Sequence, residues 1–161
     1  MNIYITAGTL DFLTKLANKY PDDLIVTMVN ENGALLLHET AGKSKFSMPR
    51  KYEVLESVGV IQKESFAIMN HIPVTDEGRP IFEHQCKIQI QKTAIVRGLR
   101  ALRLLRPISS TTYVILSVWE NEASYQSWQN SDSFMKAGTG LDAQQKIFAS
   151  APYISKYSII E

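Results

Sequence analysis

The chain has 161 residues, of which 45% are hydrophobic and 20% charged, and a formal net charge of +1, so it suits one ordinary globular domain or two small ones. The near-zero charge argues against nucleic acid or an anionic membrane surface as a partner. Cys86 is the single cysteine, which excludes an internal disulfide, and we find neither a signal peptide nor an apolar run of about 18 residues, so we expect a cytoplasmic protein.

The first half of the chain predicts strands and helices in the order β-α-β-β-α. Alternating or continuous apolar residues mark its strands, and residues 30–33 (NENG) have the composition of a hairpin turn between two of them. Thr9 can cap the first helix, Pro49 can open the second, and Gly59 can end it. We expect strands over 2–7, 24–29 and 34–38, and helices over 10–20 and 49–58.

The second half predicts the order β-α-β-β-α-α-β. Pro80 suits the first turn of a long helix, Pro107 ends the strand that follows it, and Asn121 can cap a short helix. We expect strands over 66–74, 99–106, 113–119 and 153–160, and helices over 80–96, 121–128 and 141–148.

Each half thus has the element order of a split β-α-β unit of ferredoxin type. We therefore expect an α+β fold in which two ferredoxin-like halves pack their antiparallel sheets together as a barrel-like pseudo-dimer. A short connection near 61–65 divides an N-terminal α+β extension, 1–62, from a second domain, 63–161. Because one chain supplies both halves, we expect a monomer, with a dimer as the alternative.

Two polar or aromatic residues of the second half are candidates for chemistry. Asn70 lies in an otherwise apolar strand, where its amide offers both a donor and an acceptor, and it must face away from His71 because side chains alternate along a strand. Trp128 lies on a polar helix, which suits the wall of a pocket. The structural alternatives are an edge asparagine bonded to a loop and a core tryptophan.

The long helix offers three further candidates. Phe82 and Cys86 are four residues apart and share one face, where a small buried hydrophobe is the simplest interpretation of the cysteine. His84 suits a solvated position on the same helix. The sequence contains neither the Cys-x-x-Cys nor the His-Glu-x-x-His spacing of common metal sites.

Several motifs of the second half occur together in a characteristic order. They are FAIMNHIPV with Asn70, EGRPIFE with Phe82, the strand 113–119, and the helix that carries Trp128. Over about 66–161 this layout resembles the antibiotic biosynthesis monooxygenase family. The segments YITAGTLDFL, LLLHET and YEVLESVG of the first half are similar to the extension found in HmoB-like members of its heme-degrading, IsdG-type branch.

The resemblance implies heme as both substrate and cofactor, dioxygen as co-substrate, and an external electron donor. It places Asn70 at the asparagine that hydrogen-bonds the oxygen species and Trp128 at the tryptophan that buckles the porphyrin. Gly138 stands where that branch has its iron-binding histidine, so the metal ligand stays open, with Cys86 and His84 as candidates and Phe82 beside them. Four arginines, 97, 100, 103 and 106, could pair with heme propionates or could simply be exposed on the sheet.

Two other classes of function stay open. One is a cofactor-free monooxygenase that acts on an aromatic or quinol substrate, as other members of the larger family do. The other is a non-enzymatic signalling module, since the chain is also similar to TRAP-type signalling proteins.

Overall fold

The computed structural model describes residues 1–93, 96–130 and 149–160. The first half contains β1 (Asn2–Gly8), α1 (Leu10–Asn18), β2 (Leu24–Asn30), β3 (Gly33–Thr40) and β4 (Arg50–Gly59). The second half contains β5 (Ser65–Pro73), α2 (Arg79–Thr93), β6 (Leu99–Pro107), β7 (Thr112–Trp119), α3 (Glu122–Gln129) and β8 (Tyr153–Ile160). The expected helix over 141–148 lies outside the described residues.

The strands close into an antiparallel barrel with the order β1-β3-β2-β8-β5-β7-β6-β4. Each half contributes four neighbouring strands in the same internal order, β4-β1-β3-β2 and β8-β5-β7-β6, which is that of a ferredoxin-like unit. The halves join edge to edge through β2 with β8 and β4 with β6. The expected α+β fold of two ferredoxin-like halves in a barrel-like pseudo-dimer is therefore confirmed. The proposed division into 1–62 and 63–161 falls between β4 and β5.

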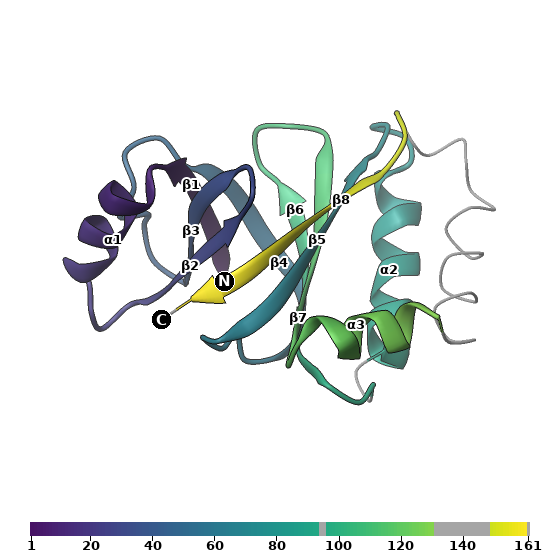
Figure 1. Ribbon diagram of the computed structural model, residues 1–161. Helices are drawn as coiled ribbons and strands as arrows, with labels where there is room; N and C mark the ends of the chain where they lie inside the picture. Colours follow the sequence, from purple (N-terminus) through teal and green to yellow (C-terminus); the bar gives the residue numbers. More distant parts are fainter. Residues whose placement is uncertain (94–95, 131–148, 161) are drawn as a thin grey trace.

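The helices lie on opposite sides of the barrel, with α1 against the first half and α2 and α3 against the second (Figure 1). The caps expected from the sequence are present: the Thr9 side chain accepts a hydrogen bond from the backbone N–H of Phe12, and Asn121 accepts one from that of Ser124. Among the described helices, none is long and apolar enough to cross a membrane.

The expected helix over 49–58 is wrong, because these residues form the strand β4. Its pairing with β6 shifts register between Val54 and Glu56, so one extra residue interrupts the alternation of side chains. Tyr52 and Val54 therefore face the barrel interior whereas Leu55 and Val58 pack on the outer face. This bulge produces the spacing that resembles a helix in the sequence.

The barrel interior is an apolar core to which both halves contribute. Its buried members include Ile3, Ile5, Val26, Met28, Leu35 and Leu37 from the first half and Ala67, Met69, Leu105, Val114, Leu116 and Ile159 from the second. A second apolar cluster lies outside the barrel between α2 and the sheet, and a third surrounds Trp119 and Tyr125 near α3. The outer face of the second half thus carries the residues singled out from the sequence.

Candidate functional site

Asn70 lies on β5, opposite Ile115 of β7 and Ile154 of β8. The preceding residue, Met69, faces the barrel core, so Asn70 faces outward, toward the side that α2 and α3 cover. Its side chain is half-buried and makes no hydrogen bond with any described residue. Among the described residues, nothing occupies the amide donor and acceptor of Asn70, so both can serve a bound molecule.

His71 follows Asn70 on the same strand but takes the opposite side, as alternation along the strand predicts. Its Nε2 lies 3.1 Å from the Ser155 hydroxyl, and its ring stacks on Tyr153 with 4.6 Å between the ring centroids. Burial lowers the pKa of His71, and the nearby Arg50 acts in the same direction. His71 thus belongs to the barrel side of β5 and not to the candidate site.

Trp128 lies at the end of α3, on the same outer face as Asn70. Its ring centroid is 5.5 Å from that of Trp119 and 6.2 Å from that of Tyr125. The aromatic cluster also contains Ile68, which lies two residues before Asn70 on the same face of β5. Trp119 is the fully buried centre of the cluster, whereas Trp128 is only half-buried at its edge. The structure thereby brings the Asn70 amide and an aromatic wall to one side of the sheet.

The three candidates on α2 do not converge. Phe82 and Cys86 are 0% and 1% exposed, and both lie in the apolar cluster between α2 and the sheet. Burial, reinforced by the charge of Glu83, raises the pKa of the Cys86 thiol to about 12, so it is protonated near neutral pH and a poor metal ligand. His84 is exposed on another face of the helix. Within the described part of the chain, no three His, Cys, Asp or Glu residues are grouped to hold a metal ion.

The four arginines considered for propionates have different roles. Arg103 is buried and pairs with Glu39, with its Nε 2.5 Å from a carboxylate oxygen, so exposure on the sheet was the wrong interpretation for this residue. Arg106 pairs with glutamates 83 and 53, and Arg100 donates to the Ser65 hydroxyl. Arg97 is exposed and forms no ion pair with a described residue. It is therefore the arginine best placed to meet an external anion.

A polar network beside the site was missed from the sequence. Arg106 donates two hydrogen bonds to the Glu83 carboxylate, at 3.0 and 2.7 Å, and the Tyr113 hydroxyl donates a third, short one. Burial alone would raise the pKa of Glu83, but these donors together hold it below its ordinary value. Arg79 also donates to the Tyr113 oxygen, at 3.2 Å. The network fastens α2 to β6 and β7, and no short motif reveals it because its members are far apart in the sequence.

Comparison with known proteins relates this fold and its candidate site to a protein family. Residues 65–139 match the model of the antibiotic biosynthesis monooxygenase family. They include Asn70, Trp128 and all three candidates on α2. The match covers nearly half of the chain and agrees with the resemblance to this family noted in the sequence.

Individual relatives fall into two functional groups. The chain is 26% identical over 129 residues to a heme-degrading monooxygenase of Listeria monocytogenes, which covers 80% of this chain and 77% of the relative. It is 24% identical over 157 residues to the signal transduction protein TRAP of Staphylococcus epidermidis. This match covers 98% of this chain and 93% of the relative.

Two solved structures share the fold over almost the whole chain. A major regulator of staphylococcal pathogenesis superposes with a TM-score of 0.90 at 23% identity and covers 100% of both chains. The heme-degrading enzyme LmHde of Listeria monocytogenes superposes with a TM-score of 0.77 at 22% identity and covers 98% of this chain and 99% of its own. At these identities the structural likeness establishes the two-half barrel alone.

Proposed function

We propose that this protein binds heme and oxidatively opens the porphyrin to release iron. The observation that carries the proposal is the half-buried amide of Asn70, which no described residue satisfies, on the same outer face as the aromatic cluster of Trp128. The heme-degrading relative from Listeria and the family match supply the class of chemistry.

Asn70 fits the polar role in such a site. Its amide N–H can donate a hydrogen bond to an oxygen atom held beside an apolar surface, where such a bond is stronger than in water. Its neighbours Ile68 and Ile72 on the same face of β5 are apolar, so water competes weakly for the amide. Asn70 would thereby orient the reacting oxygen and fix which edge of the porphyrin it approaches.

Trp128 fits the packing role. A flat porphyrin would meet the half-buried indole, which Trp119 and Tyr125 support from behind at centroid distances of 5.5 and 6.2 Å. A wall held in this way does not yield when a planar ligand presses on it, so the ligand distorts instead. Heme itself supplies the iron that activates dioxygen, with electrons from an external donor.

The candidates on α2 have different proposed roles. Phe82 and Cys86 are packed beneath the helix, so direct contact with heme requires α2 to shift, and we propose that they shape the floor of the site. His84 stays the candidate iron ligand among them, and because it is exposed on another face of α2, ligation by it requires this helix to turn. Gly138, which stands at the family's histidine position, lies outside the described residues.

A hemin titration followed by absorbance tests the proposal. We expect wild-type protein to give a saturable Soret band at micromolar concentration. Cys86→Ser should reproduce it because the buried thiol does not ligate, whereas His84→Ala should shift the band if this histidine holds the iron. Absence of any Soret change on addition of hemin to folded wild-type protein contradicts the proposal. Oxygen uptake with a hydroquinone but no hemin would instead support a cofactor-free monooxygenase.

A non-enzymatic signalling role is the second candidate. It is favoured by the TRAP relative, whose match covers 98% of the chain. This role predicts no turnover of heme and no dependence of function on Asn70. The variants described below separate the two functions.

A further inference from the structure

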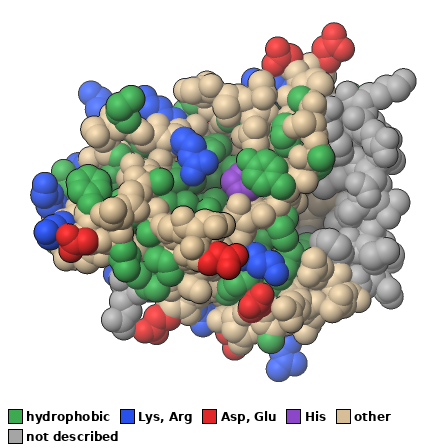
Figure 2. Space-filling model, turned by 45° about the horizontal axis from the view of Figure 1, so that its top comes forward, with side chains coloured by type: hydrophobic (Ala, Val, Ile, Leu, Met, Phe, Trp, Pro, Cys, Tyr) green, Lys and Arg blue, Asp and Glu red, His purple; other side chains and the backbone are tan. Residues whose placement is uncertain are grey.

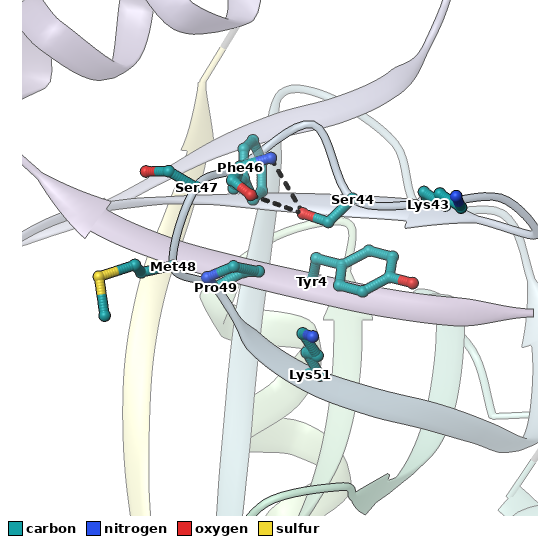
Figure 3. Close-up of a pocket in the computed structure, with 8 residues that line it drawn as sticks. All are labelled: Tyr4, Lys43, Ser44, Phe46, Ser47, Met48, Pro49 and Lys51. Carbon is teal, nitrogen blue, oxygen red and sulfur yellow. Dashed lines mark hydrogen bonds between the residues drawn. The ribbon is translucent and has the colours of Figure 1, made fainter.

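The first half contains a pocket that the proposed heme site does not use. Residues 41–49 connect β3 to β4, in the place where the second half has α3 and the residues that follow it. Between this connection and the outer face of β1 lies a pocket of about 530 Å³. Its lining includes Tyr4, Lys43, Ser44, Phe46, Met48 and Lys51 (Figure 3). This volume suits a small organic molecule.

The pocket is positively charged in an otherwise nearly neutral protein. Residues 43–51 contain four cationic side chains and no acidic one, against a net charge of +1 for the whole chain. Lys43 and Lys51 line the pocket and form no ion pair with a described residue. Figure 2 shows Lys and Arg side chains over the first half of the molecule, with apolar side chains between them. These two ammonium groups would attract an anion.

The floor of the pocket is aromatic and fixed. Phe46 and Tyr4 are 6% and 8% exposed, and behind them lies His38, whose ring centroid is 5.9 Å from that of Phe46 and 6.3 Å from that of Tyr4. The Tyr4 hydroxyl donates to the carbonyl of Gly42, and Ser44 Oγ accepts from the N–H of Phe46 at 2.9 Å. These contacts hold the connection in place over β1.

The rim of the pocket leaves an apolar side chain in water. Met48 is 90% exposed, next to Pro49, although its side chain belongs to the type most often buried. Met is also the side chain that adapts most readily to the shape of a bound molecule. A ligand with an apolar body would cover Met48 and the aromatic floor together.

We propose that this pocket binds a small organic anion, with its aryl or acyl body against Tyr4, Phe46 and Met48. Its carboxylate, sulfonate or phosphate would lie between the ammonium groups of Lys43 and Lys51. The pocket is on the α1 side of the barrel, across from α2, α3 and the proposed heme site (Figure 1). The proposal is therefore independent of heme degradation and stands or falls separately.

Titration with 1-anilinonaphthalene-8-sulfonate, an aryl sulfonate that fluoresces on binding, tests the proposal with amide NMR spectra of the same samples. We expect saturable 1:1 binding and shifted amides concentrated in residues 42–51. Lys43→Gln/Lys51→Gln should weaken binding about fivefold, because two surface ion pairs are lost. The control Lys63→Gln/Lys92→Gln removes the same charge from exposed positions elsewhere and should leave the affinity unchanged.

The uncharged analogue N-phenyl-1-naphthylamine should bind much more weakly than the sulfonate. Three outcomes overturn the proposal: equal binding of the uncharged analogue, shifted amides that lie away from residues 42–51, or an unchanged affinity in Lys43→Gln/Lys51→Gln. All four lysines are exposed, so the variants keep the fold, which unchanged amide dispersion verifies.

Discussion

At the scale of single residues, Asn70 combines two properties that stability alone does not explain. It is half-buried in an apolar stretch of β5, yet its side chain makes no hydrogen bond with a described residue. Complete burial of an amide without a partner costs about 1–3 kcal/mol, and Asn70 is half-buried. The sequence correctly predicted that Asn70 and His71 face opposite sides, because alternation along a strand is local. It could not predict that no described residue bonds to the amide, because hydrogen-bond partners come from distant segments.

We expect Asn70→Leu to leave the free energy of unfolding unchanged or to raise it, because an unsatisfied amide is replaced by an apolar group of similar size. Urea denaturation measures this change, with Asn32→Leu in the exposed β2–β3 turn as the control. A loss of more than about 1 kcal/mol would instead identify Asn70 as a structural hydrogen-bonding residue.

His38 predicts a pH dependence of stability. Burial lowers its pKa; the Asp23 carboxylate opposes this effect and Lys45 adds to it. In the unfolded chain its pKa is about 6.5, so below that pH the unfolded state binds the proton first and folding becomes less favourable. The contribution of neutral His38 to the free energy of unfolding is complete above a pH of about 6.5. It is lost as the pH falls toward the pKa of His38 in the folded state. His71, whose pKa is also lowered, acts in the same direction.

We therefore expect the free energy of unfolding to decrease as the pH falls below about 6.5, and His38→Gln to reduce that slope. Urea denaturation at a series of pH values measures it. A slope that His38→Gln leaves unaltered would mean that His38 binds its proton equally well in the folded and unfolded states, and would contradict the lowered pKa.

At the scale of elements, β4 shows where a sequence pattern misleads. Its bulge between Val54 and Glu56 places apolar residues at helical spacing, and Gly59 is a residue type that often follows the end of a helix. In the structure Gly59 has a φ of +69°, and a Cβ there would lie 2.1 Å from the carbonyl oxygen of Arg100. The glycine therefore serves a close approach to β6. By contrast, the shared face of Phe82 and Cys86 was predicted correctly, because helical periodicity is uninterrupted in α2.

An ion pair fastens β6 of the second half to β3 of the first. The Arg103 and Glu39 side chains are almost fully buried, and Arg103 also donates to the carbonyls of Val58 and Gly59 at 2.8 and 2.9 Å. We expect Arg103→Met to destabilise the protein by about 3–5 kcal/mol, because it leaves a buried carboxylate without a partner. The double variant Arg103→Met/Glu39→Leu should recover most of the loss in urea denaturation. No recovery would mean that the bonds to the two carbonyls, and not the charge pair, carry the effect.

At the scale of the whole molecule, the closed barrel removes the exposed strand edges that invite association. The edges of the two half-sheets pair with each other through β2 with β8 and β4 with β6. The repeated element order in the sequence was enough to predict two ferredoxin-like halves. The sequence did not predict which strands join the two halves, because pairing between the halves depends on twist and register over the whole barrel.

Because these edges are satisfied within one chain, we propose that the protein is a monomer. Light scattering coupled to size-exclusion chromatography should give a mass near 18.1 kDa. A mass of about twice that value would show that another surface mediates a dimer.

The decay of the hemin Soret band in the presence of ascorbate and catalase tests the central claim most directly. We predict that wild-type protein loses the band and releases iron, and that Asn70→Ala and Trp128→Phe slow this decay at least about tenfold while they bind hemin nearly as well, because these residues act on the reacting ligand. Asn32→Ala, in the exposed β2–β3 turn, should decay like the wild type. A stable Soret band in the wild-type protein, or equal decay in all four proteins, contradicts the account.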